Sequence, residues 1–200
     1  MNKAVFLDRD GVINPLVYNP ATSEYESPHY PEDFSIFTYV LKSLKFLKKH
    51  CFKIYIISNQ PSYAKGKTTL ENIKNIEKLL FDFSLENGRL IDDFFYCYHH
   101  PEGIVPEYSI FCRCRKPDTL FLEKAVKENN LDAGNCFLVG DQDTDIECGK
   151  KMNFYTIKIN NKHSMKKSGK LNSDDSADDL YEAVNKIINR AAANSEANIT

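Results

Sequence analysis

Three absences narrow the classes of protein to which this 200-residue chain can belong. No segment contains the roughly 20 consecutive apolar residues that span a bilayer, so we expect no membrane partner. No apolar signal segment follows Met1, which favours the cytoplasm as the compartment. The chain has no large excess of charge of one sign: it contains 26 Lys and Arg and 28 Asp and Glu, which gives a net charge of −2. That balance argues against a nucleic-acid partner.

The residues that are present have the composition of one globular domain. Apolar residues make up 42% and charged residues 27% of the chain, which supports one sizeable core but not two full domains. We expect residues 1–190 to form this domain as a monomer, and residues 191–200 to be a flexible tail. Six cysteines without a secretory signal favour reduced thiols or a metal site over a disulfide framework.

Short apolar runs alternate with helical patterns, which is typical of βαβ units and a mostly parallel sheet. Apolar residues recur at helical spacing over 37–47 and 70–83, and further helices are predicted around 122–126 and over Leu180–Ile188. The predicted strands lie near Ala4–Leu7, Lys53–Ile57, Asp93–Tyr98, Cys136–Val139 and Tyr155–Ile159. The sequence thus predicts an α/β fold, a three-layer Rossmann-like parallel sheet of about five strands with helices on both faces.

Local signals indicate where helices begin and where long loops lie. Thr68 and Glu71 have the spacing of a capping box at the start of the second helix, and Asp118 is expected to cap the third. Residues 162–175 are polar and are predicted to form a solvated loop. Three long connections follow the carboxyl ends of predicted strands, where open α/β sheets bind ligands: Asn14–Asp33, Pro61–Lys67 and His99–Lys116.

The first predicted strand ends in two carboxylates on one turn. One residue separates Asp8 from Asp10, so both side chains can face one site, and Gly11 lets the chain turn sharply. Alone, such a pair is more often an Asx-rich turn without chemistry. Here polar residues also follow the second and fourth strands and precede the third helix: Ser58, Asn59, Arg115, Lys116, Asp141 and Asp145. Together they supply what is needed to hold a phosphoryl group and a magnesium ion.

The chain resembles the haloacid dehalogenase-like phosphatases, whose four motifs appear in order: Asp8-x-Asp10, Ser58, Lys116 and Gly140-Asp141-x-x-x-Asp145. The resemblance implies a phosphomonoester hydrolase in which Asp8 is the nucleophile and Asp10 the general acid and then base. Ser58 would donate to the phosphoryl oxygens, and Lys116 would stabilise their charge. The magnesium ligands would be Asp8, the backbone carbonyl of Asp10, and Asp141, with Asp145 behind them or at a helix start.

A second cluster combines thiols and an imidazole at short spacing. Three thiols and one imidazole are the four soft ligands of a closed, structural zinc site, here Cys97, His99, Cys112 and Cys114. His100 is a competing imidazole, and buried free cysteines with surface histidines are the plainer alternative. Zinc would pin both ends of a long loop and fix Arg115 and Lys116 beside the active site. The remaining thiols are expected to be core or surface fillers: Cys51, Cys136 and Cys148.

The loop that carries this cluster narrows the resemblance. Residues 97–103 and 112–117 look like the zinc-containing D-glycero-D-manno-heptose 1,7-bisphosphate phosphatases, as do residues 6–14, 58–60 and 64–67. This likeness implies removal of the C7 phosphate, and it places Arg115 and Lys65 near the sugar or its second phosphate. Histidinol-phosphate phosphatases share the cluster but usually have a shorter loop, so the longer segment His99–Tyr108 favours the heptose branch. Histidinol-phosphate and other sugar or polyol phosphatases are the alternative. The chain departs from the heptose pattern in substrate-facing loops, at Pro61, Tyr63 and Gln142.

Three further expectations concern the class of protein. Neither residues 14–33 nor the segment between Lys116 and Asp141 has room for a separate cap domain. A catalytically inactive, zinc-stabilised binding scaffold is disfavoured, because the proposed nucleophile, acid, lysine and metal ligand are all intact. An aspartyl-phosphate signalling receiver fits acidic strand ends, but it does not fit the second acid Asp10 or the zinc loop.

Overall fold

One sheet of six parallel strands runs through the structure, a computed structural model that describes residues 2–164, 169 and 171–197. The strands lie side by side in the order β5-β4-β1-β6-β7-β8. Their bounds are Asn2–Leu7 (β1), Lys53–Asn59 (β4), Asp93–Cys97 (β5), Leu131–Gly140 (β6), Tyr155–Ile159 (β7) and Asp175–Ala177 (β8). The predicted α/β sheet is confirmed, with one strand more than expected.

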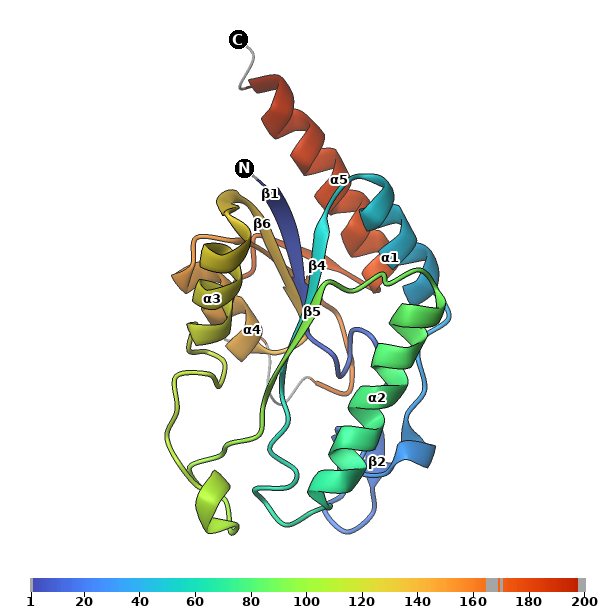
Figure 1. The fold of residues 1–200 in the computed structure, drawn as a ribbon, viewed down its shortest axis with the longest axis vertical. Coiled ribbons are helices and arrows are strands. Elements are labelled where there is room, and N and C mark those ends of the chain that lie inside the picture. Colours follow the sequence, from blue (N-terminus) through green and yellow to red (C-terminus); the bar gives the residue numbers. More distant parts are fainter. Residues whose placement is uncertain (1, 165–168, 170, 198–200) are drawn as a thin grey trace.

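Helices cover both faces of the sheet, so the fold has three layers (Figure 1). One face packs against α1, α2 and α5, and the other against α3 and α4. The helices span Val40–Lys49 (α1), Leu70–Glu86 (α2), Leu120–Asn129 (α3), Asp143–Lys151 (α4) and Leu180–Ala197 (α5). None of these helices is long and apolar enough to cross a membrane.

Strand β1 shows why the sheet is buried on both faces. Successive side chains of a strand point to opposite faces. Ala4 and Phe6 pack in the core beneath α3 and α4, whereas Val5 and Leu7 pack in the core beneath α1 and α5. All four side chains are fully buried. A central strand such as β1, covered on both faces, therefore needs a continuous apolar run.

The long connection after β1 folds into a small hairpin instead of a further domain. Strand β2 (Val17–Asn19) pairs antiparallel with β3 (Glu24–Glu26), and a short 3₁₀ helix, η1 (Pro31–Asp33), follows. Glu26 accepts hydrogen bonds from Lys67 Nζ at 2.6 Å and from Thr22 Oγ1 at 2.7 Å. This contact ties the hairpin to the loop after β4.

Two predicted helix caps are wrong by one residue each. Helix α2 begins after Thr69, whose side chain accepts from the amide of Asn72, while Thr68 donates to the carbonyl of His29. The N-cap position of α3 is Thr119, not Asp118, and its side chain makes no capping bond. Threonine repeats and short polar runs leave such starts ambiguous, because neighbouring residues offer the same oxygen.

The C-terminal third also differs from the expectation. Helix α5 continues to Ala197, so part of the segment predicted as a tail is helical, and residues 198–200 lie outside the described part. The polar segment 162–175 ends where the short strand β8 begins, and β8 pairs with β7. Residues 165–168 and 170 of that segment also lie outside the description.

Candidate active site

The polar residues predicted from the sequence meet at the carboxyl edge of the sheet. Because all six strands are parallel, β1, β4 and β6 end at the same edge, with Asp8, Ser58 and Asp141 at their ends. A cavity of about 260 Å³ opens there. Its lining contains most of the predicted site: Asp8, Asp10, Ser58, Asn59, Lys65, Arg115, Lys116 and Asp145.

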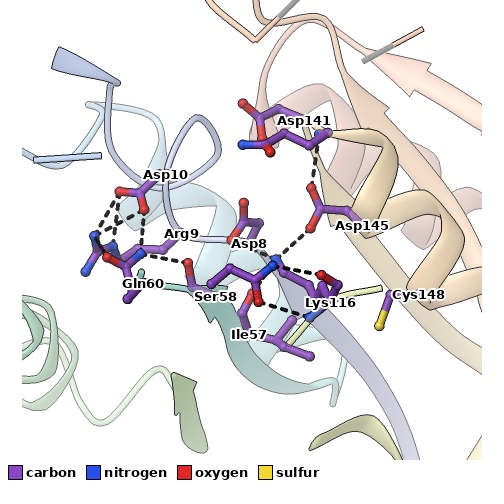
Figure 2. Close-up of polar contacts among 12 residues, drawn as sticks. Asp8, Arg9, Asp10, Ile57, Ser58, Gln60, Lys116, Asp141, Asp145 and Cys148 are labelled. Carbon is purple, nitrogen blue, oxygen red and sulfur yellow. Dashed lines mark hydrogen bonds and ion pairs between the residues drawn. The ribbon is translucent and has the colours of Figure 1, made fainter. Parts of the chain in front are cut away.

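Lys116 is the central charge of this site (Figure 2). Its Nζ lies 2.9 Å from Asp8 Oδ1 and 2.6 Å from Asp145 Oδ1, and it donates to the carbonyl of Ile57 at 2.8 Å. The side chain is almost fully buried. Burial alone would lower the pKa of Lys116, but Asp145 and Asp8 outweigh it and raise the pKa above its usual value. Lys116 therefore carries a permanent positive charge beside the proposed nucleophile.

The carboxylates outnumber this cation. Burial raises the pKa of Asp8 to about 6 in spite of Lys116, and it raises the pKa of Asp141 well above the usual value with help from Asp8 and Asp145. Gly11, at φ +87°, permits this crowding, because a Cβ there would lie 2.1 Å from Asp141 Oδ2. The site is built to take up further positive charge.

These acids fit a magnesium ion. Carboxylate oxygens of Asp8, Asp141 and Asp145 lie within 4.8 Å of one another, and oxygen is the ligand that magnesium prefers. Asp141 Oδ1 is buried and has no hydrogen-bond partner among the residues that the structure describes. Asp145 is already engaged by Lys116 and by the amide of Gln142 at 3.0 Å. All three acids could therefore hold the ion, and the division into the ligands Asp8 and Asp141 with Asp145 behind them stays a prediction.

Asp10 lines the same cavity as Asp8, and its carboxylate lies in a cage of donors that the sequence did not reveal (Figure 2). Arg9, which is fully buried, donates to both carboxylate oxygens at 3.0 and 3.1 Å. Asn14 Nδ2 donates at 2.9 Å and Gln60 Nε2 at 2.6 Å. Burial would raise the pKa of Asp10, but Arg9 and these hydrogen bonds lower it below the usual value.

Asn59 and Ser58 occupy neighbouring positions with different contacts. The side-chain amide of Asn59 makes two hydrogen bonds of 3.0 Å to the backbone of Lys116. Asn59 Nδ2 donates to the carbonyl of Lys116, and Asn59 Oδ1 accepts from its backbone N–H. Ser58 lines the cavity, and its Oγ accepts from Gln60 Nε2 at 3.0 Å. The predicted substrate contact of Asn59 therefore stays a prediction, whereas its hold on Lys116 is direct.

The segment after β7 contributes to the site, contrary to its prediction as a solvated loop. Ser164 is buried and its hydroxyl donates to Asp141 Oδ2, which Asn161 Nδ2 also approaches at 3.4 Å. The ring of His163 stacks on Tyr25 of the hairpin, with centroids 3.6 Å apart. No pattern in a run of polar residues distinguishes these contacts from a solvated loop, because they depend on where β7 ends.

The predicted thiol cluster assembles at the end of β5. Cys114 Sγ lies 3.2 Å from Cys97 Sγ, 3.3 Å from Cys112 Sγ and 3.4 Å from His99 Nδ1. These separations are far longer than the roughly 2.05 Å of a disulfide. They approach the edges of a tetrahedron whose metal–sulfur bonds are about 2.3 Å. The four side chains could therefore hold zinc, and His99, not His100, supplies the imidazole.

The loop that carries the thiols is tied to the cavity. Arg115 Nη1 donates to the carbonyl of His99 at 3.3 Å, and Ala64 O accepts from the amides of Ile104 at 2.7 Å and Val105 at 3.2 Å. His100, which was not predicted to bind substrate, also lines the cavity. Through these hydrogen bonds the thiol loop helps to hold the two segments that face the cavity, one with Arg115 and the other with Lys65.

A larger cavity, of about 600 Å³, lies along the edge strand β5 away from this chemistry. Aromatic rings such as Phe94 and Tyr96 line much of it, and the predicted catalytic residues do not. The convergence of charged side chains, not cavity size, identifies the candidate active site.

Comparisons with known proteins show which folds and sequences this chain resembles. A family model described as HAD-hydrolase-like matches residues 113–183. A D,D-heptose 1,7-bisphosphate phosphatase from B. bronchiseptica, solved with magnesium and phosphate, has a TM-score of 0.76 at 19% identity, covering 94% of this chain and 99% of its own. The solved structure shows the same fold, and the family model indicates a haloacid dehalogenase-like hydrolase over residues 113–183.

Sequence relatives define the family within that class. A D-glycero-alpha-D-manno-heptose-1,7-bisphosphate 7-phosphatase from Photorhabdus laumondii is 36% identical over 149 residues, which cover 74% of this chain and 77% of the relative. A D-glycero-D-manno-heptose-1,7-bisphosphate 7-phosphatase from Chlorobaculum tepidum is 29% identical over 194 residues, 93% of this chain and 94% of the relative. The chain belongs to this heptose-bisphosphate phosphatase family.

Proposed function

We propose that this enzyme removes the C7 phosphate of D-glycero-D-manno-heptose 1,7-bisphosphate through a phospho-Asp8 intermediate. The observation that carries the proposal is the pairing of a buried carboxylate with a buried cation, Asp8 and Lys116, 2.9 Å apart at the floor of a small cavity. A nucleophilic carboxylate is repelled by an anionic phosphate, and a fixed positive charge offsets that repulsion.

The reaction divides into two displacements at phosphorus. The first displacement needs Asp10 in its protonated form, although Arg9 and the hydrogen bonds around Asp10 lower its pKa. An oxygen of Asp8 then forms a bond to phosphorus, the phosphorus–oxygen bond to the sugar breaks, and Asp10 gives its proton to the departing oxygen. In the second, Asp10 takes a proton from water as that water attacks phospho-Asp8 and releases inorganic phosphate. A bound magnesium ion would neutralise the phosphoryl oxygens. Asp8 and Asp141, with the backbone carbonyl of Asp10, are the residues that would hold it.

The second phosphate of the substrate needs its own positive surface. Arg115, Lys65 and His100 line the same cavity as Asp8. Burial lowers the pKa of Arg115, but the guanidinium remains charged at any ordinary pH, and its planar fork suits bidentate contact with a phosphate. We assign Arg115 to the unreacting C1 phosphate, with Lys65 assisting.

Zinc, compartment and assembly complete the proposal. We infer that Cys97, His99, Cys112 and Cys114 bind one structural zinc ion, which keeps Arg115 in place through the carbonyl of His99. None of the six cysteines is in a disulfide, which suits the reducing cytoplasm. Residues 1–190 would act as one domain and as a monomer, because a single chain supplies every group in the mechanism.

The direct test is a phosphate-release assay with purified protein and magnesium. We expect heptose 1,7-bisphosphate to lose one phosphate, and phosphorus NMR to identify it as the C7 phosphate. Chelation should stop the reaction reversibly. A preference for histidinol phosphate would move the assignment to that alternative, and release of the C1 phosphate would contradict the proposed orientation.

A further inference from the structure

We propose that Gln60 is a positioning residue for the leaving-group step, holding the acid Asp10 and the donor Ser58 in one hydrogen-bonded unit. This inference rests on the proposed phosphatase mechanism, in which Asp10 protonates the departing oxygen. Gln60 is almost fully buried at the end of β4 and has no assigned part in that mechanism.

Its three hydrogen bonds fix the orientation of the amide. Gln60 Oε1 accepts from Arg9 Nη2 at 2.7 Å, while Nε2 donates to Asp10 Oδ2 at 2.6 Å and to Ser58 Oγ at 3.0 Å. A guanidinium can only donate, so the amide oxygen has to face Arg9 whether Asp10 is ionised or protonated. Turning the amide over would place oxygen against the carboxylate and NH₂ against the guanidinium, so only one orientation fits.

This orientation decides what the Ser58 hydroxyl can do. Ser58 Oγ accepts from Gln60, and Nε2 has no lone pair to receive the Ser58 hydrogen. That hydrogen is therefore available to the cavity, where the proposed phosphoryl oxygens lie. Gln60 thus couples the position of the acid to the direction in which the phosphoryl donor points.

The preceding residue carries a matched amide with a different partner. Asn59 makes two hydrogen bonds of 3.0 Å to the backbone of Lys116, whereas Gln60 holds Asp10. Lys116 serves the phosphoryl group whatever alcohol departs, while Asp10 matters most when the departing oxygen is strongly basic. Two adjacent amides therefore support two separable parts of the reaction.

Substrates of equal size but different leaving groups separate these parts. The value of kcat/KM for phenyl phosphate and for 4-nitrophenyl phosphate reports the first displacement, and nitrophenolate departs with little need for a proton. We expect Gln60→Ala to lose at least about tenfold more on phenyl phosphate than on 4-nitrophenyl phosphate, within the 10²–10⁴-fold range of general acid catalysis. Asn59→Ala should lose equally on both.

Further variants exclude simple loss of structure. Gln60→Met keeps the length of the side chain without its hydrogen bonds, and it should show the same selective loss; its melting temperature should fall somewhat, because buried groups of Arg9 and Asp10 lose a partner. Misfolding would instead lower both rates by one factor. Asp10→Asn serves as the benchmark for complete loss of the acid.

The outcomes distinguish this inference from the function on which it rests. A selective loss for Asp10→Asn but equal losses for both Gln60 variants would overturn the role of Gln60 alone. No leaving-group dependence for Asp10→Asn would overturn the acid role of Asp10, and with it the inference. No hydrolysis by the wild type would overturn the proposed function itself.

Discussion

The carboxylate cluster and the thiol cluster are both groups of potential metal ligands, yet the fold treats them in opposite ways. Asp8 and Asp141 directly follow buried central strands, so the sheet itself sets their positions. Cys112 and Cys114 lie in a long loop that buries little apolar surface, with Phe111 beside them 90% exposed. The sheet fixes the positions of the carboxylates, whereas the loop that carries the thiols has to be ordered by metal binding at the thiols themselves.

This difference separates the residues that react with the phosphate from the residue that is proposed to select the substrate. Asp8 depends on the core, and Lys116, although it ends the thiol-bearing loop, is also held by Asn59 and by the carbonyl of Ile57 on β4. These two groups should therefore survive damage to the loop. Arg115, which follows Cys114 and donates to the carbonyl of His99, depends on the loop. Substitutions in the two regions should therefore have distinct signatures in activity and stability.

The largest effect is expected at the carboxylate cluster. Asp8→Asn removes the nucleophile, and we expect turnover to fall by a factor of about 10⁴ or more, as for nucleophiles of other covalent enzymes. The fold should remain, because Lys116 keeps its 2.6 Å contact with Asp145. Phosphate release and a thermal melt of the same sample check both statements. Activity close to that of the wild type would rule out the covalent route.

The next effect separates the two adjacent cations. Arg115→Ala should weaken catalysis on the heptose bisphosphate by about 2–5 kcal/mol, the cost of removing one partner of a desolvated charge pair. A small phosphate ester without a second phosphate should be little affected. Lys116→Ala, the matched control, should harm both substrates alike. Equal losses for Arg115→Ala on the two substrates would remove its assignment to the second phosphate.

Damage to the thiol cluster should be smaller and local. Protein purified without chelator should contain one zinc per chain, and Cys112→Ser should lose it. We expect hydrogen exchange to speed up in residues 99–116 and KM for the bisphosphate to rise about tenfold, while kcat for a small ester stays near that of the wild type. Zinc-free protein with unchanged exchange and activity would contradict the structural role of the cluster.

The smallest effect concerns the hairpin contact on the other side of the 61–67 loop. Burial would raise the pKa of Glu26, but its hydrogen bonds, chiefly from Lys67, lower it from 4.5 to about 2. A lowered pKa stabilises the folded state above about pH 4.5, and this stabilisation is lost as the pH falls towards 2. Solvent screening limits it to about 1 kcal/mol.

Urea unfolding at several pH values tests this linkage. The free energy of unfolding should fall between pH 4.5 and pH 2 less steeply for Glu26→Gln than for the wild type. Identical slopes for the two proteins would show that Glu26 is not ion-paired in solution.

The sequence predicted the residues whose places follow from strand ends. Asp8, Ser58 and Asp141 each terminate a buried apolar run, and parallel strands bring such ends together. The thiol ligands were also predictable, because their spacing within the chain restricts how they can meet. In both cases local pattern and chemistry point to the same place.

The residues that were missed depend on contacts between distant segments. Gln60 follows Ser58 and Asn59 directly, but its contacts with Asp10 exist only once β1 and β4 pair. Ser164 reaches Asp141 from a polar run with no distinguishing pattern, and the short strand β8 has too few apolar residues to be visible. Polar side chains without periodicity acquire their partners only from the tertiary fold.

Rapid quenching of the reaction tests the central claim most directly. Wild-type protein mixed with magnesium and heptose 1,7-bisphosphate should be stopped in acid within the first turnovers and analysed by peptide mass spectrometry. The account predicts one added phosphoryl group on Asp8, which disappears as the substrate is exhausted and is absent in Asp8→Asn. Release of inorganic phosphate without any phosphorylated Asp8, or with the phosphoryl group on another residue, would contradict it.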